Sequence, residues 1–215
     1  MTRAAAVAAA GLREPLPPGL PAALAELVAA DADARVRAAA LGALARLPAP
    51  SADPWLRATA DADPAVRRRA AELSPAFPAD RTASVLVGMT ADRDGSVAEA
   101  AAWALGEVGS AGVAAGAVAV LAGVASDHGD PLVREAAVAA LGSLGDPGGL
   151  AAVLAACRDK PAIRRRAVLA LAAFDGPEVE AALRAALEDK DWQTRQAAED
   201  LLGDSPTASP GPNAR

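Results

Sequence analysis

One stretch decides the fold of this chain: Asp130-Pro131-Leu132-Val133-Arg134-Glu135-Ala136-Ala137-Val138-Ala139-Ala140-Leu141-Gly142-Ser143-Leu144-Gly145. It opens with an aspartate, whose carboxylate can accept hydrogen bonds from the unpaired amides of a helix start. A proline follows at the first helical position, where a missing N–H costs nothing. Val133, Ala137 and Leu141 recur at helical spacing and form one apolar stripe. The stretch therefore predicts one capped helix that ends at a glycine.

Five further versions of this stretch occur along the chain. We use the position of Val133 as a register mark, and the six marks are separated by 30, 31, 36, 30 and 31 residues. A fixed period of this length is the signature of a helical solenoid. The sequence therefore predicts an all-α protein, an α-α superhelix of about six helix-pair repeats, each with a helix A followed by a helix B. The marks are Val36, Val66, Val97, Val133, Ile163 and Thr194.

Other columns of the alignment hold the same register. Three residues before the mark, five of six copies carry a capping aspartate: Asp33, Asp63, Asp94, Asp130 and Asp191, with Lys160 as the exception. Four residues after the mark, alanine is present in every copy, and this small side chain lets neighbouring helices approach closely. These alanines are Ala40, Ala70, Ala101, Ala137, Ala167 and Ala198.

This pattern resembles the HEAT repeat, most closely the short bacterial form called the phycobilisome-lyase HEAT-like repeat. The residues that carry the resemblance are 130–145 and, as a second clear copy, 189–195. The resemblance covers roughly residues 20 to 203 and implies stacked antiparallel helix pairs, with helix B lining the concave face. It says little about function, because this repeat occurs in binding scaffolds, lyase subunits and regulators.

The repeat boundaries give three segments. Residues 1–19 are predicted to be an N-terminal capping segment and a proline-rich linker, residues 20–203 the solenoid, and residues 204–215 a disordered tail. The long spacing in repeat four predicts a longer helix A over residues 113–125. The prolines in residues 74–78 end helix B of repeat two early, so we expect a kink and the weakest interface between repeats there.

Composition narrows the class of protein. Apolar residues make up 53% of the 215 residues and aromatic residues only 2%, which suits close-packed alanine-rich helices. A net charge of −6 argues against a nucleic-acid partner, which normally requires a basic face. No run is long and apolar enough to span a membrane, and the start of the chain is too weakly apolar for a signal peptide. We expect a cytoplasmic monomer.

An arginine follows the mark in five of the six copies. These arginines resemble the arginine ladder of HEAT-like proteins, a series in which each arginine pairs with a loop aspartate of its own or the adjacent repeat. Asp31, Asp61, Asp92 and Asp189 are the candidate partners, and Ala98 interrupts the ladder in repeat three. Contact with a ligand is the alternative role. The arginines are Arg37, Arg67, Arg134, Arg164 and Arg195.

The positions two, three and six residues after the mark point away from the apolar stripe. They are predicted to line the concave face, with a basic, acidic and basic order along its length and an exposed tryptophan that could anchor a partner. The alternatives are a solvated helix face for the arginines and burial for Trp103. Trp55 and Trp192, at helix starts, are predicted to pack. The predicted partner-binding residues are Arg68, Arg69, Glu99, Trp103, Glu107, Glu135, Arg165 and Arg166.

The sequence contains few residues that could catalyse a reaction or bind a metal ion. His128 is the one histidine and is predicted to lie in a loop, while the one cysteine, Cys157, is predicted to be buried. No metal, cofactor or catalytic site is expected, because metal ligands need a cluster and no catalytic motif is present. The leading hypothesis is a non-catalytic scaffold that binds a protein or peptide on its concave face. The alternative is a lyase or tailoring-enzyme subunit related to phycobilin lyases.

Overall fold

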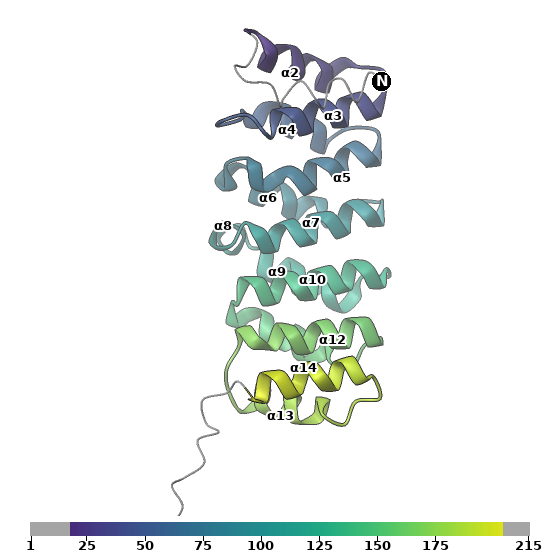
Figure 1. The fold of residues 1–215 in the computed structure, drawn as a ribbon, viewed down its shortest axis with the longest axis vertical. Helices are drawn as coiled ribbons and strands as arrows, with labels where there is room; N and C mark the ends of the chain where they lie inside the picture. The colour runs from purple at the N-terminus through teal and green to yellow at the C-terminus, as the bar shows by residue number, and fades with distance from the viewer. Residues whose placement is uncertain (1–17, 204–215) are drawn as a thin grey trace, which may run out of the picture.

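The computed structural model describes residues 18–203, and all regular structure in this range is helical. Six antiparallel helix pairs stack along one axis (Figure 1), which confirms the predicted all-α solenoid. Of the N-terminal segment predicted for residues 1–19, all but the last two residues lie outside the described range, as does the whole tail predicted for residues 204–215.

The helices form two layers. The A layer consists of α2 (Leu20–Ala30), α4 (Ala52–Thr59), α6 (Ala79–Met89), α9 (Ala117–Asp127), α11 (Leu150–Ala156) and α13 (Pro177–Ala186). The B layer consists of α3 (Ala34–Leu44), α5 (Pro64–Leu73), α7 (Gly95–Glu107), α10 (Pro131–Leu144), α12 (Pro161–Ala170) and α14 (Trp192–Gly203). Short elements complete the chain: α8 (Ser110–Ala114), η1 (Ser74–Ala76), η2 (Pro147–Gly149) and η3 (Leu171–Ala173).

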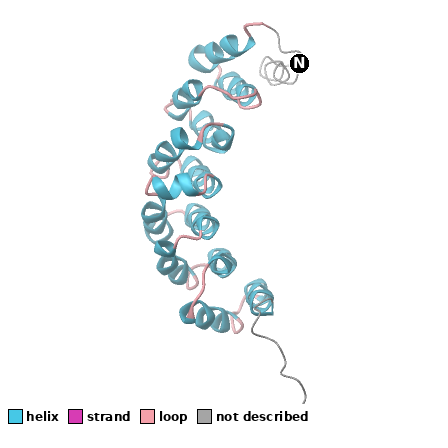
Figure 2. Cartoon of the chain, turned by 90° about the vertical axis from the view of Figure 1, so that its left-hand side faces the viewer, coloured by secondary structure: helices cyan, strands magenta, loops and turns pink. Residues whose placement is uncertain are grey.

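The stack is curved. The B helices face the viewer in Figure 1, and Figure 2, turned by 90°, shows the same layer on the inner side of the arc. The B helices therefore line the concave face and the A helices the convex face, as the resemblance to HEAT repeats implied.

The aspartate column caps the B helices as predicted. The carboxylates accept hydrogen bonds from backbone amides at the helix starts at 2.8–3.0 Å. Lys160, the one exception in the column, provides no side-chain cap. Local sequence thus fixes where most B helices begin. The capping residues are Asp33, Asp63, Asp94, Asp130 and Asp191.

Small residues bring adjacent B helices into backbone contact. The marks and the alanines four residues later are buried in every repeat. At the α10–α12 contact, a Cβ atom added to Gly142 would lie 2.7 Å from the Cβ of Ala170 and 2.9 Å from its Cα. At the α7–α10 contact, a Cβ on Gly106 would lie 3.0 Å from the Cα of Ala140. The glycines are therefore a packing requirement of the concave layer.

The predicted arginine ladder is present and joins each repeat to the next. In each ladder pair, Nε and Nη2 of the arginine donate to the two carboxylate oxygens of an aspartate in the following A–B loop, at 2.7–3.0 Å. Nη1 donates to carbonyl oxygens of the arginine's own loop, as from Arg67 to Asp61 at 2.8 Å. Two loops are thereby tied to one side chain. The pairs are Arg37–Asp61, Arg67–Asp92, Arg134–Asp159 and Arg164–Asp189.

Two details of the ladder differ from the prediction. Asp159 is a partner that the column at five residues before the mark could not include, because it lies one residue closer to its mark. Among the described residues, Arg195, in the last repeat, keeps only the contact with its own loop, in which its Nη1 donates to the carbonyl oxygen of Asp189 at 2.6 Å. Asp31 contributes its carbonyl oxygen to Arg37 in the same way.

Where the ladder is interrupted, both the arginine and its aspartate partner are replaced. Ala98 replaces the arginine, and His128 replaces the aspartate that this arginine would meet in the following loop. His128 keeps the local role of that aspartate, because its Nδ1 accepts the amide of Asp130 at 3.1 Å. In the regular repeats a carboxylate does this, as Asp61 does for the amide of Asp63. The joint replacement leaves no ladder charge unpaired at this junction.

Repeat four departs from the prediction of one long helix A. The inserted residues form two helices, α8 and α9, and Gly116 lies between them with a φ of +80°. A left-handed conformation is accessible to glycine without a steric cost, so the glycine-rich insertion turns the chain and cannot extend the helix.

The end of repeat two is irregular, as predicted. Helix α5 stops at Leu73 and is followed by η1, and Ser74 occupies the column that holds leucine in other repeats. Its hydroxyl is buried with no hydrogen-bond partner among the described residues. Phe77 fills the space beside Trp55, with ring centroids 6.0 Å apart, and the Trp55 indole donates to the carbonyl of Ala70. The kink and the weak interface remain predictions.

Replacing Gly142 by alanine tests the close approach of the B helices. An added methyl group must push α10 and α12 apart, so we expect the free energy of unfolding to fall by about 1–3 kcal/mol. The matched control is Gly123→Ala in α9, where nothing lies within 4 Å of the added Cβ. There we expect a gain of about 0.5–1 kcal/mol, the usual effect in an exposed helix. Urea unfolding measures both, and a stable Gly142→Ala variant would contradict this packing.

Restoring the missing ladder pair tests the ladder. Ala98→Arg alone places a cation at a buried position without a partner and is expected to destabilise the chain, while His128→Asp alone is expected to change little. The double variant recreates the pair seen at the other junctions. A double-mutant cycle on urea unfolding is expected to give a favourable coupling energy of about 1 kcal/mol or more. Additive effects would show that the gap cannot hold a ladder pair.

The ladder also predicts a response to acid. Hydrogen bonds from the partner arginines hold the pKa of Asp92, Asp159 and Asp189 below the ordinary 3.8. A carboxylate with a lowered pKa in the folded state contributes stability above pH 3.8, and this stability is lost as the pH falls through the folded-state value. We expect Arg134→Gln to be less stable than the parent at pH 7 and the difference to shrink between pH 4 and pH 2. A constant difference in urea midpoint would contradict this role.

Candidate functional site

The concave face is a wall of small and charged side chains. The column six residues after the mark holds Gly42 and Ala139, both buried, and the charged residues Glu72 and Asp200. Two large apolar side chains stand out in the same column: Trp103 on α7, with 39% of its surface exposed, and Leu169 on α12, with 44% exposed. The structure thus places Trp103 on the surface, as predicted, in the central part of the face.

Trp103 lies between two hollows of this face. The first, between α5 and α7, has a volume of about 370 Å³, and we call it the acidic hollow. The second, between α10 and α12, has a volume of about 250 Å³ and is lined by Trp103, Ser143, Arg166 and Leu169 among others. The indole is therefore a ridge with space on both sides. The acidic hollow is lined by Arg68, Glu72, Pro75, Ser96, Glu99, Ala100, Trp103, Ala104 and Glu107.

The basic residues near the N-terminal end of the face already have partners within the chain. Arg68 and Arg69 both contact the carboxylate of Glu72, at 3.2 and 3.0 Å. Arg69 also reaches back over α3, where its Nη2 lies 3.4 Å from the position of a Cβ on Gly42. An acidic partner would have to compete with Glu72 for this pair.

The arginines on α12 are engaged too. Arg165 donates a hydrogen bond to the side chain of Gln193 on α14. Arg166 extends across α10, where its Nη2 lies 3.5 Å from Glu135, and its guanidinium carbon lies 5.3 Å from the centroid of the Trp103 ring. This separation suits a cation–π contact. The face therefore holds together side chains from three successive B helices around Trp103.

Two glutamates of the face differ from these arginines. The carboxylates of Glu99 and Glu107, both on α7, form no hydrogen bond or ion pair with any residue in the described range 18–203. Both line the acidic hollow beside Trp103. The predicted order of basic, acidic and basic residues is present along α5, α7 and α12. The charge without an internal partner in the centre is negative.

The three tryptophans differ in their exposure to solvent. Trp55 is fully buried, as predicted for a packing residue. Trp192 was predicted to pack, and this is wrong, because 64% of its surface is exposed at the start of α14. It lies two residues before the mark, a position that other repeats fill with alanine, proline or glycine at the helix start. The register itself could have shown that this position faces outward.

Sequence reasoning missed two features of the site. Leu169 shares the column of Trp103, so the register could have identified it as a second exposed apolar residue. The contact of Arg166 with Trp103 joins repeats five and three, and nothing in the repeat spacing signals it. It depends on the curvature of the stack and on the small residues of α10 between them.

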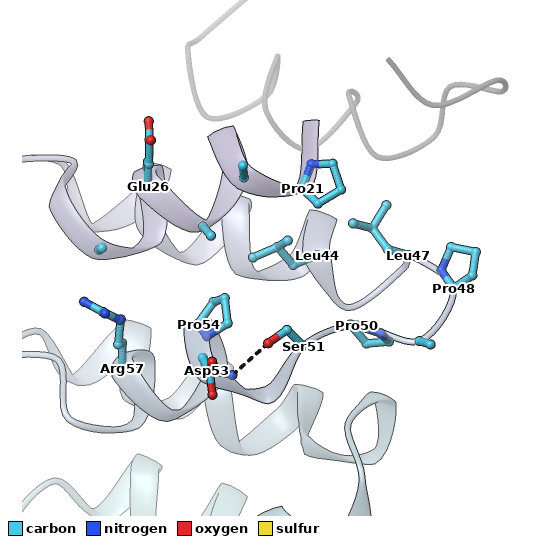
Figure 3. Close-up of a pocket in the computed structure, with 14 residues that line it drawn as sticks. Pro21, Glu26, Leu44, Leu47, Pro48, Pro50, Ser51, Asp53, Pro54 and Arg57 are labelled. Atoms are coloured by element: carbon cyan, nitrogen blue, oxygen red, sulfur yellow. Dashed lines mark hydrogen bonds between the residues drawn. The ribbon is translucent and has the colours of Figure 1, made fainter. Parts of the chain in front are cut away.

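Another hollow lies between the A helices α2 and α4, near the N-terminal end of the described range (Figure 3). It has a volume of about 900 Å³, and alanines, prolines, Leu44 and Leu47 make up most of its lining. Its hydroxyl, that of Ser51, already accepts the amide of Asp53. The concave face is the better candidate site, because it brings an aromatic ring and charged groups together.

The remaining reactive groups are a cysteine and scattered acidic residues. Cys157 is half-buried, and burial raises the pKa of its thiol to about 11, so the thiol is protonated at neutral pH. Within residues 18–203, no group of three or more His, Cys, Asp or Glu side chains is arranged to hold a metal ion. None of the helices in this range has the length and apolar character needed to cross a bilayer.

Comparison with known families agrees with the architecture. HEAT repeats match residues 82–162 and 158–211, which together span more than half of the chain. The chain belongs to the HEAT repeat family. A search of curated proteins found no match.

Solved structures show the same fold. The X-ray structure of the Escherichia coli protein YibA has a TM-score of 0.67 at 15% identity, covering 94% of this HEAT repeat chain and 74% of that protein. A designed armadillo repeat protein in complex with the peptide (KR)4 has a TM-score of 0.63 at 17% identity, covering 86% and 98%. Computationally designed armadillo repeat proteins for modular peptide recognition give 0.56 at 18% identity, covering 85% and 90%. At these identities the likeness concerns the fold alone.

Proposed function

We propose that this HEAT repeat chain is a non-catalytic scaffold that holds an extended protein or peptide segment on its concave face. The observation that carries the proposal is the position of Trp103, exposed between two hollows on the concave face. Large, rigid aromatic side chains at the centre of an interface contribute a large share of binding energy. The proposal also takes the chain to be a cytoplasmic monomer.

The wall suits a segment without much secondary structure of its own. Alanine and glycine along the B layer let a partner backbone come close, and the two hollows accept side chains on either side of the indole. Six B helices about 9–10 Å apart make a face roughly 50 Å long. An extended chain rises about 3.3 Å per residue, so up to about 15 residues could lie along it.

The solved structures give further support at the level of the fold. Two of the similar designed armadillo repeat proteins are described by peptide recognition or by a bound peptide. Solenoids of this kind present extended concave surfaces for binding. This is an analogy, and the proposal stands on the residues around Trp103.

The second candidate, a lyase or tailoring-enzyme subunit of the phycobilisome-lyase HEAT-like type, has weaker support. It stands on the resemblance of the repeats, and the match to HEAT repeats does not specify this type. The one thiol in the chain is protonated at neutral pH and so is a poor nucleophile. We therefore rank it second.

The proposal predicts that Trp103→Ala weakens partner binding and leaves folding nearly intact. Loss of a central tryptophan anchor commonly costs about 2 kcal/mol or more, roughly a thirtyfold loss of affinity. Trp192→Ala is the matched control, because it removes an exposed indole outside the two hollows. Partners retained from a native lysate by the parent chain would be quantified for each variant, with melting temperature measured in parallel. A sharp drop in melting temperature with unchanged binding would make Trp103 a packing residue.

A further inference from the structure

We infer that the segment bound on the concave face carries a basic side chain, arginine or lysine, that enters the acidic hollow and contacts Trp103, Glu99 and Glu107. The inference rests on the proposed function and adds the chemistry of the ligand to it.

Three residues on α7 are arranged to hold a cation. Glu99, Trp103 and Glu107 are spaced four residues apart, so they lie on one face of the helix, about 6 Å from one to the next. All three line the same hollow. A carboxylate thus stands on each side of the indole along one helix. A long cationic side chain can lay its apolar stem on the ring and its charge against a carboxylate.

Among the described residues, the acidic hollow has no cation for the carboxylates of Glu99 and Glu107. Its lining contains three glutamates, Glu72, Glu99 and Glu107, and one arginine, Arg68. Arg68 is engaged with Glu72 at 3.2 Å. Glu99 and Glu107 have no ion pair within the described chain. The lining therefore carries a net charge of −2, and a cation would bring charge-assisted hydrogen bonds that no described residue supplies.

The Trp103 ring already binds one arginine of the chain. Arg166 places its guanidinium 5.3 Å from the centre of the Trp103 ring while it faces the carboxylate of Glu135. The chain itself thus holds an arginine with an indole and a carboxylate from neighbouring helices. The acidic hollow offers the same pair of groups, without an occupant from the described residues. An acidic side chain there would be repelled, and an apolar one would leave the carboxylates desolvated.

The test uses three fluorescein-labelled octapeptides as probes: (KR)4, the acidic (DE)4 and the neutral (QS)4. Fluorescence anisotropy would compare the parent chain with the double variant Glu99→Gln/Glu107→Gln. The control is Glu178→Gln/Glu188→Gln, which changes the net charge by the same amount at two exposed positions, one at the start of α13 and one in the loop after it. We expect (KR)4 to bind the parent and the control equally and the double variant about tenfold more weakly, with a weaker dependence on salt. We expect the other two peptides to bind poorly to all three proteins.

Three results would overturn the inference. They are no binding of (KR)4 to the parent, equal binding to the parent and the double variant, or an equal loss in the control, which would show only an effect of overall charge. Trp103→Ala, measured with the same peptides and with partners from the lysate, separates this inference from the proposed function. If Trp103→Ala loses its partners while the glutamate variant does not, the scaffold stands without the basic ligand. If neither variant loses binding, both proposals fail.

Discussion

Everything in this molecule depends on the contact of one B helix with the next at the distance of a glycine or an alanine. At Gly142 and Ala170 the backbones leave no room for one more methyl group. Helices this close form one continuous surface, and the curvature of the stack places this surface on the concave side (Figure 2). Large side chains cannot lie between such helices, so those that remain, Trp103 and Leu169, stand on the surface. The packing rule that forms the solenoid also exposes its candidate anchor.

The arginine ladder adds register to this contact. Apolar stripes of alanine are weakly specific, because one turn of helix resembles the next. A guanidinium that binds two carboxylate oxygens of the following loop and carbonyl oxygens of its own loop fits one alignment of the repeats. The pairs are largely shielded from solvent, so each charge needs its partner and a shifted register would leave both unpaired. We interpret the ladder as the device that fixes how the repeats stack.

The sequence was sufficient for the fold because the repeat columns report local and neighbouring contacts. Capping aspartates, stripe alanines and ladder arginines each act within one repeat or on the next one, and six copies make the columns visible. It was insufficient where a single copy departs from the others: Asp159 is displaced by one residue, and Gly116 turns the chain inside an insertion. The site was predictable in part. Register placed Trp103 on the concave face, but whether an arginine there is free or bound to Glu72, Glu135 or Gln193 is decided by rotamers across several helices.

The absent ladder pair between repeats three and four has a consequence for how such a chain can be built. Each of the other four junctions between the described repeats carries an arginine on one side and its aspartate on the other. A genetic crossover at one of those junctions separates an arginine from its aspartate, so the incoming repeat has to supply the missing counterpart. A crossover between Ala98 and His128 separates no such couple. This junction is therefore the point at which three-repeat halves of the protein could be exchanged, duplicated or replaced with the least electrostatic cost, by evolution or by a protein engineer.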